Sequence, residues 1–210
     1  MSTVISPAEQ RVIIDDVSWE TYVRLCDETG NRHERLAYDQ GTLEIMSPSL
    51  PHEDGKKLIG RMIEVYTEEL GIDIRSVSST TFKREDLQRG FEADESYYVQ
   101  NEEAVRDKSE IDLTIDPPPD LVIEVDISRS AMNKFGIYRA LGIPEIWRHD
   151  GDRRQVFLLG RKDYKPSTTS RAFPDLPIPE ILRFLKLQRS MSETQLIRAF
   201  RQQVREHFGV

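Results

Sequence analysis

The sequence predicts an α/β domain in which short strands and helices alternate along the chain. Apolar residues recur at helical spacing over 53–70, and the apolar run over 120–128 is typical of a central strand. A length of 210 residues with 38% hydrophobic residues suffices for one core of ordinary size. Because no repeat or linker interrupts residues 1–210, we expect a single domain.

The N-terminal half is expected to form a helix, a hairpin and a second helix. A short helix is predicted over 17–29. The turn signal D-Q-G separates two apolar runs within 35–48, which predicts a hairpin. The helix over 53–70 is followed by Gly71, a residue type that favours the left-handed conformation of a C-terminal cap.

The rest of the chain is expected to supply most of the sheet and three more helices. Strands are predicted over 72–82, 92–100, 110–116, 120–128, 145–150 and 154–160, and helices over 132–142, 175–187 and about 191–208. Ser190 and Glu193 have capping-box spacing before the last helix. Its apolar face could pack on its own domain or on a second copy in a homodimer.

The composition narrows the class of protein. The net charge of −8 argues against a broad nucleic-acid-binding surface, although residues 181–210 carry +4. A single cysteine, Cys26, excludes an internal disulfide framework and fits a reducing compartment. No apolar stretch approaches the roughly 20 residues of a membrane span, and the N-terminus lacks a signal-peptide pattern. We therefore expect a cytoplasmic protein.

The segment PPPDLVIEVDIS places two acids within an apolar strand. Because strand side chains alternate between faces, Glu124 and Asp126 share one face and Val125 lies on the other. Two carboxylates buried side by side are costly unless a cation binds them, and Mg²⁺ prefers such oxygen ligands. Lys134, on the following helix, could reach the end of the strand and assist an attacking water.

Ordinary structural roles could explain the same residues. Acids at strand ends usually face solvent or pair with an arginine, and Arg129 and Arg139 are close in sequence. Asp120 could join the site, but an aspartate after a proline run more often opens a turn. Asp94 taken alone has the context of a loop or cap residue. The histidines lack zinc-site spacing, and no Walker, Rossmann or nucleophile-elbow glycine pattern occurs.

Several stretches together resemble the Uma-two family of bacterial endonuclease-like domains, which belongs to the PD-(D/E)xK restriction-endonuclease-like superfamily. They are SWETYVRL, YDQGTLEIMSPSLPHE, TTFKRED, FEADESYYV, PPPDLVIEVDIS, KFGIYRALGIPEIWR and AFPDLPIPEILRFL. The resemblance runs from about 17 to 188, which leaves the C-terminal helix at about 191–208 outside it. It implies a restriction-endonuclease-like mixed β-sheet core flanked by helices.

The resemblance also implies a catalytic core of Asp94, Glu124 and Lys134. Asp94 matches the aspartate of the PD element, with Ala93 in place of its proline. Glu124 matches the glutamate of the ExK element, whose lysine position is Asp126. In this family the lysine stands on the following helix, and Lys134 occupies that position.

The implied metal is Mg²⁺ or Mn²⁺, bound by Asp94, Glu124 and the backbone at Val125. Asp126 is expected to be a further ligand or to tune the lysine. His52 matches the family's histidine after M-S-P-S and is expected to contact a substrate phosphate, although capping of its helix explains it equally well.

Two departures from the family pattern bear on activity. Many relatives carry a glutamate in the first hairpin strand where this chain has Ala37, unless Glu34 or Glu44 substitutes for it. An aspartate common four residues before the lysine is Ser130 here. The hypothesis is a Mg²⁺-dependent endonuclease that hydrolyses DNA phosphodiester bonds. The alternatives are a decayed nuclease fold that binds nucleic acid or protein and, more weakly, a hydrolase of small phosphate esters.

Overall fold

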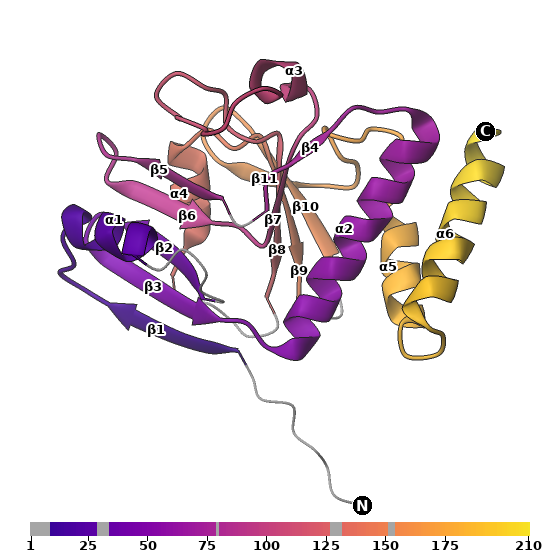
Figure 1. The fold of residues 1–210 in the computed structure, drawn as a ribbon, viewed down its shortest axis with the longest axis horizontal. Helices are drawn as coiled ribbons and strands as arrows, with labels where there is room; N and C mark the ends of the chain where they lie inside the picture. The colour runs from indigo at the N-terminus through magenta and orange to yellow at the C-terminus, as the bar shows by residue number, and fades with distance from the viewer. Residues whose placement is uncertain (1–8, 29–33, 79, 127–131, 151–153) are drawn as a thin grey trace, which may run out of the picture.

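The computed structural model describes residues 9–28, 34–78, 80–126, 132–150 and 154–210. Their strands form two sheets, and helices cover both of them (Figure 1). The mixed α/β architecture predicted from the sequence is confirmed. Among the described helices, none combines the length and apolarity that crossing a membrane requires.

The first sheet is antiparallel and has the strand order β1-β3-β2-β6-β5. Its strands are β1 (Gln10–Ile14), β2 (Arg35–Asp39), β3 (Thr42–Ser47), β5 (Thr81–Arg84) and β6 (Arg89–Glu92). Helix α1 (Trp19–Glu28) covers one face, where Tyr22 stacks on Tyr38 with ring centroids 4.9 Å apart. Gly90 passes directly against the Tyr22 ring, where a Cβ would lie 2.3 Å from the hydroxyl oxygen, so a larger residue would clash.

The second sheet is mixed and has the order β11-β10-β9-β8-β7-β4. Its strands are β4 (Arg75–Ser76), β7 (Glu95–Tyr98), β8 (Leu121–Val125), β9 (Glu145–His149), β10 (Arg154–Leu159) and β11 (Tyr164–Ser167). Among the described strands of this sheet, only β8 and β9 pair in parallel, and α4 (Lys134–Ala140) lies between these two strands in the sequence. The end of the acidic strand and the start of α4 lie close together, because Lys134 of α4 contacts Glu124 of β8.

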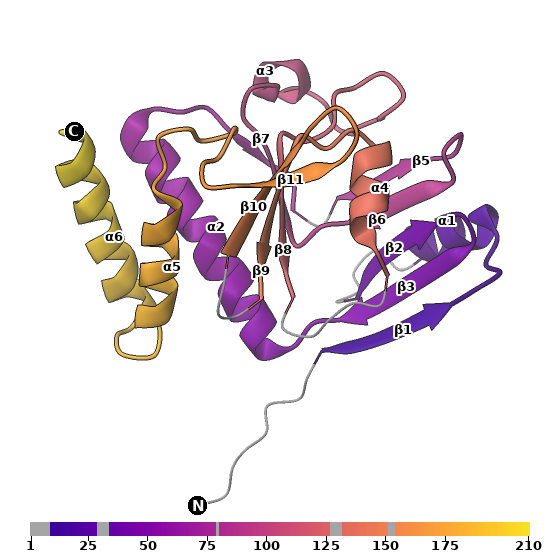
Figure 2. The ribbon, with the colours of Figure 1, turned by 180° about the vertical axis from the view of Figure 1, so that it is seen from behind.

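Helix α2 (Leu50–Leu70) lies against β8 on one face of the second sheet, and α5 (Ile178–Leu187) and α6 (Glu193–Phe208) pack on α2 (Figure 1). Leu121, Ile123 and Val125 belong to the core on this side. Val122 belongs to a separate core that includes Ile137 of α4 and Phe91 of β6. From behind, α4 is seen between the two sheets (Figure 2). The predicted alternation of β8 side chains between its two faces is confirmed.

The apolar face of α6 packs on α2 and α5 of its own chain through Leu196, Ile197, Phe200 and Val204. Packing within the chain therefore accounts for this face. The capping box is made by Ser192 and Gln195, not by Ser190 and Glu193, because the helix begins two residues later than expected. Helix α2 ends at Leu70, and Gly71 forms the predicted left-handed C-terminal cap with φ 63°.

Other sequence-based predictions were wrong in detail. Residues 110–116 form turns, not a strand, because Asp112 and Asp116 bond to backbone and side-chain groups within this segment. The strand expected over 72–82 is limited to the two residues of β4 before β5 begins at Thr81. Strands β1, β6 and β11 and the short helix α3 (Glu102–Val105) were not predicted. Missing β1 matters most, because this strand reaches the candidate site.

Candidate active site

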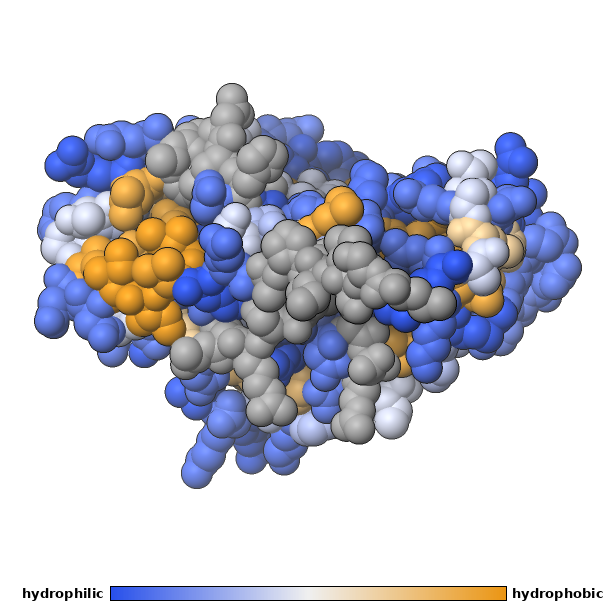
Figure 3. Space-filling model, turned by 90° about the horizontal axis from the view of Figure 1, so that it is seen from below, coloured by the Kyte–Doolittle hydropathy of each residue, from blue (hydrophilic) through white to orange (hydrophobic). Residues whose placement is uncertain are grey.

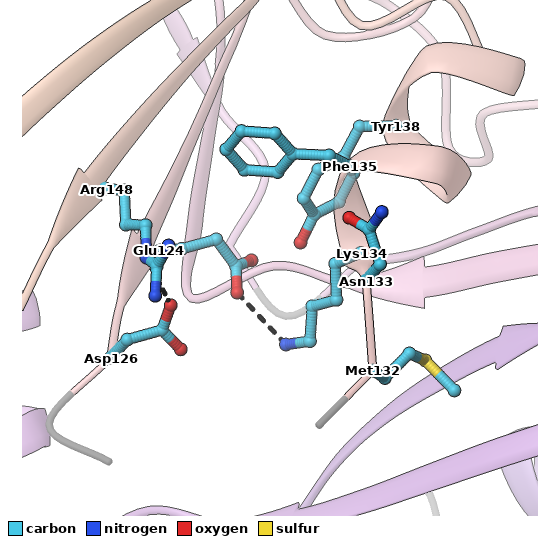
Figure 4. A pocket seen from close by; sticks show the side chains of 8 residues that line it. All are labelled: Glu124, Asp126, Met132, Asn133, Lys134, Phe135, Tyr138 and Arg148. Atoms are coloured by element: carbon cyan, nitrogen blue, oxygen red, sulfur yellow. Dashed lines mark hydrogen bonds and ion pairs between the residues drawn. The ribbon is translucent and has the colours of Figure 1, made fainter. Parts of the chain in front are cut away.

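The three residues predicted as a catalytic core lie together where the two sheets meet. Asp94 immediately precedes β7, Glu124 lies near the end of β8, and Lys134 is the first residue of α4. The Lys134 ammonium donates to Glu124 Oε2 at 3.0 Å (Figure 4). Asp94 Oδ2 accepts from the backbone N–H of Val125 at 2.7 Å, which fixes Asp94 beside the same stretch of β8.

Lys134 is buried, with 9% of its surface exposed. Burial acts to lower the pKa of Lys134, but the nearby carboxylates of Glu124, Glu44 and Asp94 outweigh it, so the pKa lies above its ordinary value. The ammonium is therefore charged over the whole physiological range. It approaches Glu44 Oε1 at 3.7 Å as well as Glu124. Lys134 thus provides a fixed positive charge inside the site.

Glu124 differs from the other acids because one of its oxygens has no partner. Within the described residues, Oε1 is buried and makes no hydrogen bond. The hydroxyl of Tyr138 points toward the carboxylate and acts to lower the pKa of Glu124, but within the described part of the chain the two groups do not reach standard hydrogen-bond geometry (Figure 4). Burial raises the pKa of Glu124 to about 7, against the opposing charge of Lys134 and with a further increase from Asp94 and Asp126.

The pKa of Asp94 is shifted in the opposite direction from that of Glu124. Its Oδ1 lies 2.9 Å from His52 Nε2 on α2, and His52 Nδ1 lies 2.7 Å from Glu9 Oε1. Burial acts to raise the pKa of Asp94, but the hydrogen bond and charge of His52, the charge of Lys134 and the hydrogen bond from the Val125 N–H together outweigh it, so the pKa lies below its usual value. Two adjacent carboxylates therefore have pKa values moved in opposite directions.

His52 has no exposed surface in this arrangement. Burial acts to lower its pKa, but the hydrogen bonds to Asp94 and Glu9 and the negative charges of both carboxylates together outweigh it and raise the pKa to about 9. The ring is therefore a cation that joins two carboxylates. The sequence predicts a phosphate contact for His52, whereas this geometry favours a role in positioning Asp94.

Asp126 has both oxygens engaged by arginines. Oδ1 accepts from Arg11 Nη2 of β1 at 3.0 Å, and Oδ2 accepts from Arg148 Nε of β9 at 2.9 Å. Arg11 also binds Glu9 and Glu44, each at 3.0 Å. This geometry favours a role for Asp126 in orienting guanidinium groups over the expected role as a metal ligand.

Glu44 brings a carboxylate to the position where many relatives carry a glutamate and this chain has Ala37. The two residues are directly opposite each other in the β2–β3 ladder, so their side chains share one face of the sheet. Glu44 is 1% exposed and reaches both Arg11 and Lys134. Of the two substitutes considered from the sequence, Glu44 is thus the one brought to the site.

Several residues weighed from the sequence have structural roles. Asp120 accepts hydrogen bonds from the backbone N–H groups of Val99 and Asn101, which ties down the loop after β7. Arg139 approaches Asp163, not the acidic strand. Arg129 and Ser130 lie outside the described residues.

Sequence reasoning missed Glu9, Arg11 and Arg148. Glu9 and Arg11 were missed because β1 was not predicted. Arg148 was missed because the register between β8 and β9 is needed to place it beside Glu124. In that parallel ladder Arg148 is the direct partner of Glu124. Tyr138 is fully buried, and its hydroxyl faces the site.

The site opens into a cleft of about 260 Å³ between β8, β9 and the start of α4. It is lined by Glu124, Asp126, Met132, Asn133, Lys134, Phe135, Tyr138 and Arg148 (Figure 4). A fixed ammonium, a carboxylate that titrates near neutrality and a guanidinium thus face one small polar space. Such a combination suits the binding and hydrolysis of an anionic ester.

Comparison with known proteins places this chain in a family. No curated protein matches the chain. Residues 19–191, most of the chain and all three predicted catalytic residues, match the model of the family Uma2, described as "Putative restriction endonuclease". The resemblance noted from the sequence motifs is thereby confirmed, and the chain belongs to the Uma2 family.

Proposed function

We propose that this protein is a Mg²⁺- or Mn²⁺-dependent endonuclease that hydrolyses DNA phosphodiester bonds. The observation that carries the proposal is the unpartnered Oε1 of Glu124, buried beside a charged lysine at the base of a polar cleft. A buried carboxylate oxygen without a hydrogen bond is unfavourable unless it has a ligand. Family membership supplies the reaction class.

The residues fit a hard divalent cation. Mg²⁺ takes oxygen ligands and is usually held by one or two carboxylates, with water completing its shell. Glu124 Oε1 and Asp94 would hold it together with the backbone carbonyl of Val125. Each Asp94 oxygen makes one hydrogen bond and keeps a further lone pair. When bound, the metal would lower the pKa of a coordinated water and neutralise charge on the phosphate.

No ready-made cluster of three or more His, Cys, Asp or Glu ligands exists in the described ranges. The acids are instead separated by Arg11, His52 and Lys134. This arrangement predicts that metal binding depends on Glu124 giving up its proton, so affinity should rise as the pH passes about 7.

The chain's own residues have separate tasks in the proposed reaction. Lys134 keeps its proton, orients the attacking water and stabilises negative charge that develops on the phosphate. His52, held by Glu9, fixes the orientation of Asp94. Because these groups stand on strands and helix ends, the site is preorganised before substrate arrives.

The ion-pair network also supports one alternative. Arg11 and Lys134 pair with Glu9, Glu44 and Asp126 without any metal, as expected of a decayed nuclease that only binds nucleic acid. Neither Asp94 nor Glu124 is paired with an arginine in the described part of the chain, however. That difference favours the enzyme.

The test combines metal binding with cleavage. A ligand that binds only the native state raises the melting temperature, so Mn²⁺ should stabilise the wild type, and Glu124→Ala should abolish that increase. Mn²⁺ should also support nicking of plasmid DNA by the wild type but not by Glu124→Ala. Glu64→Ala, on the exposed side of α2, is the matched control and should behave as wild type. Binding of DNA with neither a metal-dependent shift nor nicking would decide for the binding module.

A further inference from the structure

Arg148 is placed beside the catalytic carboxylate by the sheet itself. It is the direct partner of Glu124 in the parallel β8–β9 ladder, so both side chains project from the same face. Figure 4 shows Arg148, Glu124 and Lys134 around the same cleft. The position of the guanidinium therefore follows from strand register and not from a flexible loop.

Asp126 fixes the orientation of this guanidinium. Its Oδ2 accepts from Arg148 Nε at 2.9 Å, while its Oδ1 is held by Arg11. The bond to Nε uses one of five guanidinium N–H donors. The two terminal nitrogens of Arg148 make no hydrogen bond in the part of the chain that the structure describes. Its side chain is 36% exposed and lines the cleft.

The cleft suits one group of a polymer better than a whole small ligand. Pockets that enclose drug-sized molecules measure roughly 300–1,000 Å³, whereas this cleft measures about 260 Å³. Its charged lining residues are Glu124, Asp126, Lys134 and Arg148. These charges cancel when Glu124 is ionised, and a bound divalent cation would make the lining positive. The loaded cleft would therefore attract a phosphate.

We infer that Arg148 is a substrate-binding residue that donates hydrogen bonds to a non-bridging phosphate oxygen of the nucleic-acid backbone. Asp126 is its positioning residue. The inference rests on the proposed nuclease function and adds the residue that anchors the substrate. A guanidinium with paired terminal N–H donors matches the geometry of a phosphate, which a lysine ammonium cannot reproduce.

The competing role for Arg148 is simple neutralisation of Asp126. A charge-balanced double variant separates the two roles. In Arg148→Gln/Asp126→Asn the local net charge equals that of the wild type, but the phosphate donors are gone. If Arg148 only neutralises Asp126, the double variant should bind DNA as the wild type does. If Arg148 contacts phosphate, the double variant should remain as weak as Arg148→Gln.

The experiment measures binding separately from cleavage. Affinity for a labelled DNA duplex is followed by fluorescence anisotropy in Ca²⁺ across a salt series, with melting curves to confirm that each variant is folded. Arg148→Gln should weaken binding about tenfold and reduce the slope of log K against log salt by about 1, as loss of one phosphate contact requires. Arg148→Lys should keep the slope with reduced affinity. Arg198→Gln, exposed on α6, is the matched control.

The outcomes separate this inference from the proposed function. If Arg148→Gln binds DNA as well as Arg198→Gln does, or if the double variant recovers wild-type affinity, the phosphate-binding role of Arg148 is refuted. Metal-dependent cleavage by the wild type would still leave the nuclease proposal standing. If the wild type binds DNA through Arg148 but cleaves nothing with Mg²⁺ or Mn²⁺, the anchor stands and the nuclease proposal falls. A wild type that binds no nucleic acid overturns both.

Discussion

Two networks of charged residues join distant parts of this chain, and their environments differ sharply. At the candidate site, His52 and Lys134 are 0% and 9% exposed and contact buried acids. Between α2 and α6, arginines and glutamates pair at the surface; Arg61 and Glu193 have side chains 32% and 51% exposed. The other pairs there are Arg201 with Glu68 and Glu69, and Arg205 with Glu69.

The comparison teaches that similar ion pairs serve different purposes in the two places. An exposed pair contributes about 0–1 kcal/mol and is screened by salt, so the α2–α6 interface depends mainly on its apolar residues. A buried pair often stabilises no better than apolar residues of the same volume, yet removing one partner costs about 3–5 kcal/mol. A cluster of buried charges is therefore a stability liability, which is expected of a site retained for chemistry.

The largest effect should follow from removing the imidazolium that separates two buried acids. His52→Ala leaves Glu9 and Asp94 facing each other without their shared cation. We expect a loss of about 3–5 kcal/mol in the free energy of unfolding, measured with urea at pH 6. The matched control, His207→Ala on the exposed side of α6, should change stability little.

The pH dependence of this loss sharpens the test. The pKa of His52 is raised from 6.5 to about 9, so its stabilising charge is fully present below pH 6.5 and is lost as the pH rises through 9. The difference in unfolding free energy between wild type and His52→Ala should decline over that window. A difference independent of pH would show that His52 is neutral in the folded protein.

The sequence could predict those parts of the site whose contacting residues are close together in the chain. Alternation along one strand placed Glu124 on the face opposite Val125, and the short connection to the next helix brought Lys134 within reach. Both inferences use neighbours in sequence. The resemblance to a family then supplied Asp94, whose isolated context carries no signal of its own.

The missed residues depend on pairing between distant segments. β1 shows no alternation of burial: Val12, Ile13 and Ile14 are all exposed, at 55%, 39% and 42%. The strand forms because it pairs with β3, Ile14 opposite Leu43, and nothing local specifies that pairing. Arg11 reaches Asp126 only through this contact. Local patterns thus predicted Glu124 and Lys134, but not Arg11 and Arg148, which hold Asp126.

An effect of intermediate size should appear when the buried glutamate is made neutral. The folded-state pKa of Glu124 is raised from 4.5 to about 7, so the native state binds the extra proton between these values and stability falls as the pH rises through them. The stability of the wild type relative to Glu124→Gln should therefore decrease by roughly 3 kcal/mol from pH 4.5 to 7. Urea unfolding at several pH values measures this difference.

The control for this prediction is Glu193→Gln, an exposed acid of the α2–α6 network. The free energy of unfolding of Glu193→Gln relative to wild type should stay nearly constant over pH 4.5–7. If Glu124→Gln tracked the wild type throughout that window, the pKa of Glu124 would not be raised in the folded protein, and Lys134 would offset the effect of burial. The proposed competition between a proton and a metal ion at Glu124 would then lose its basis.

The smallest effect should come from the surface network, where Arg61→Gln breaks the pair with Glu193. We expect a loss of about 0–1 kcal/mol, read as a small decrease in melting temperature. In 1 M salt the Debye length shrinks to about 3 Å, so this decrease should vanish. The loss caused by His52→Ala should persist in the same buffer, because water and ions do not reach a side chain with 0% exposure. Equal sensitivity to salt would mean that the candidate site is open to solvent and that its charges are no more desolvated than those between α2 and α6.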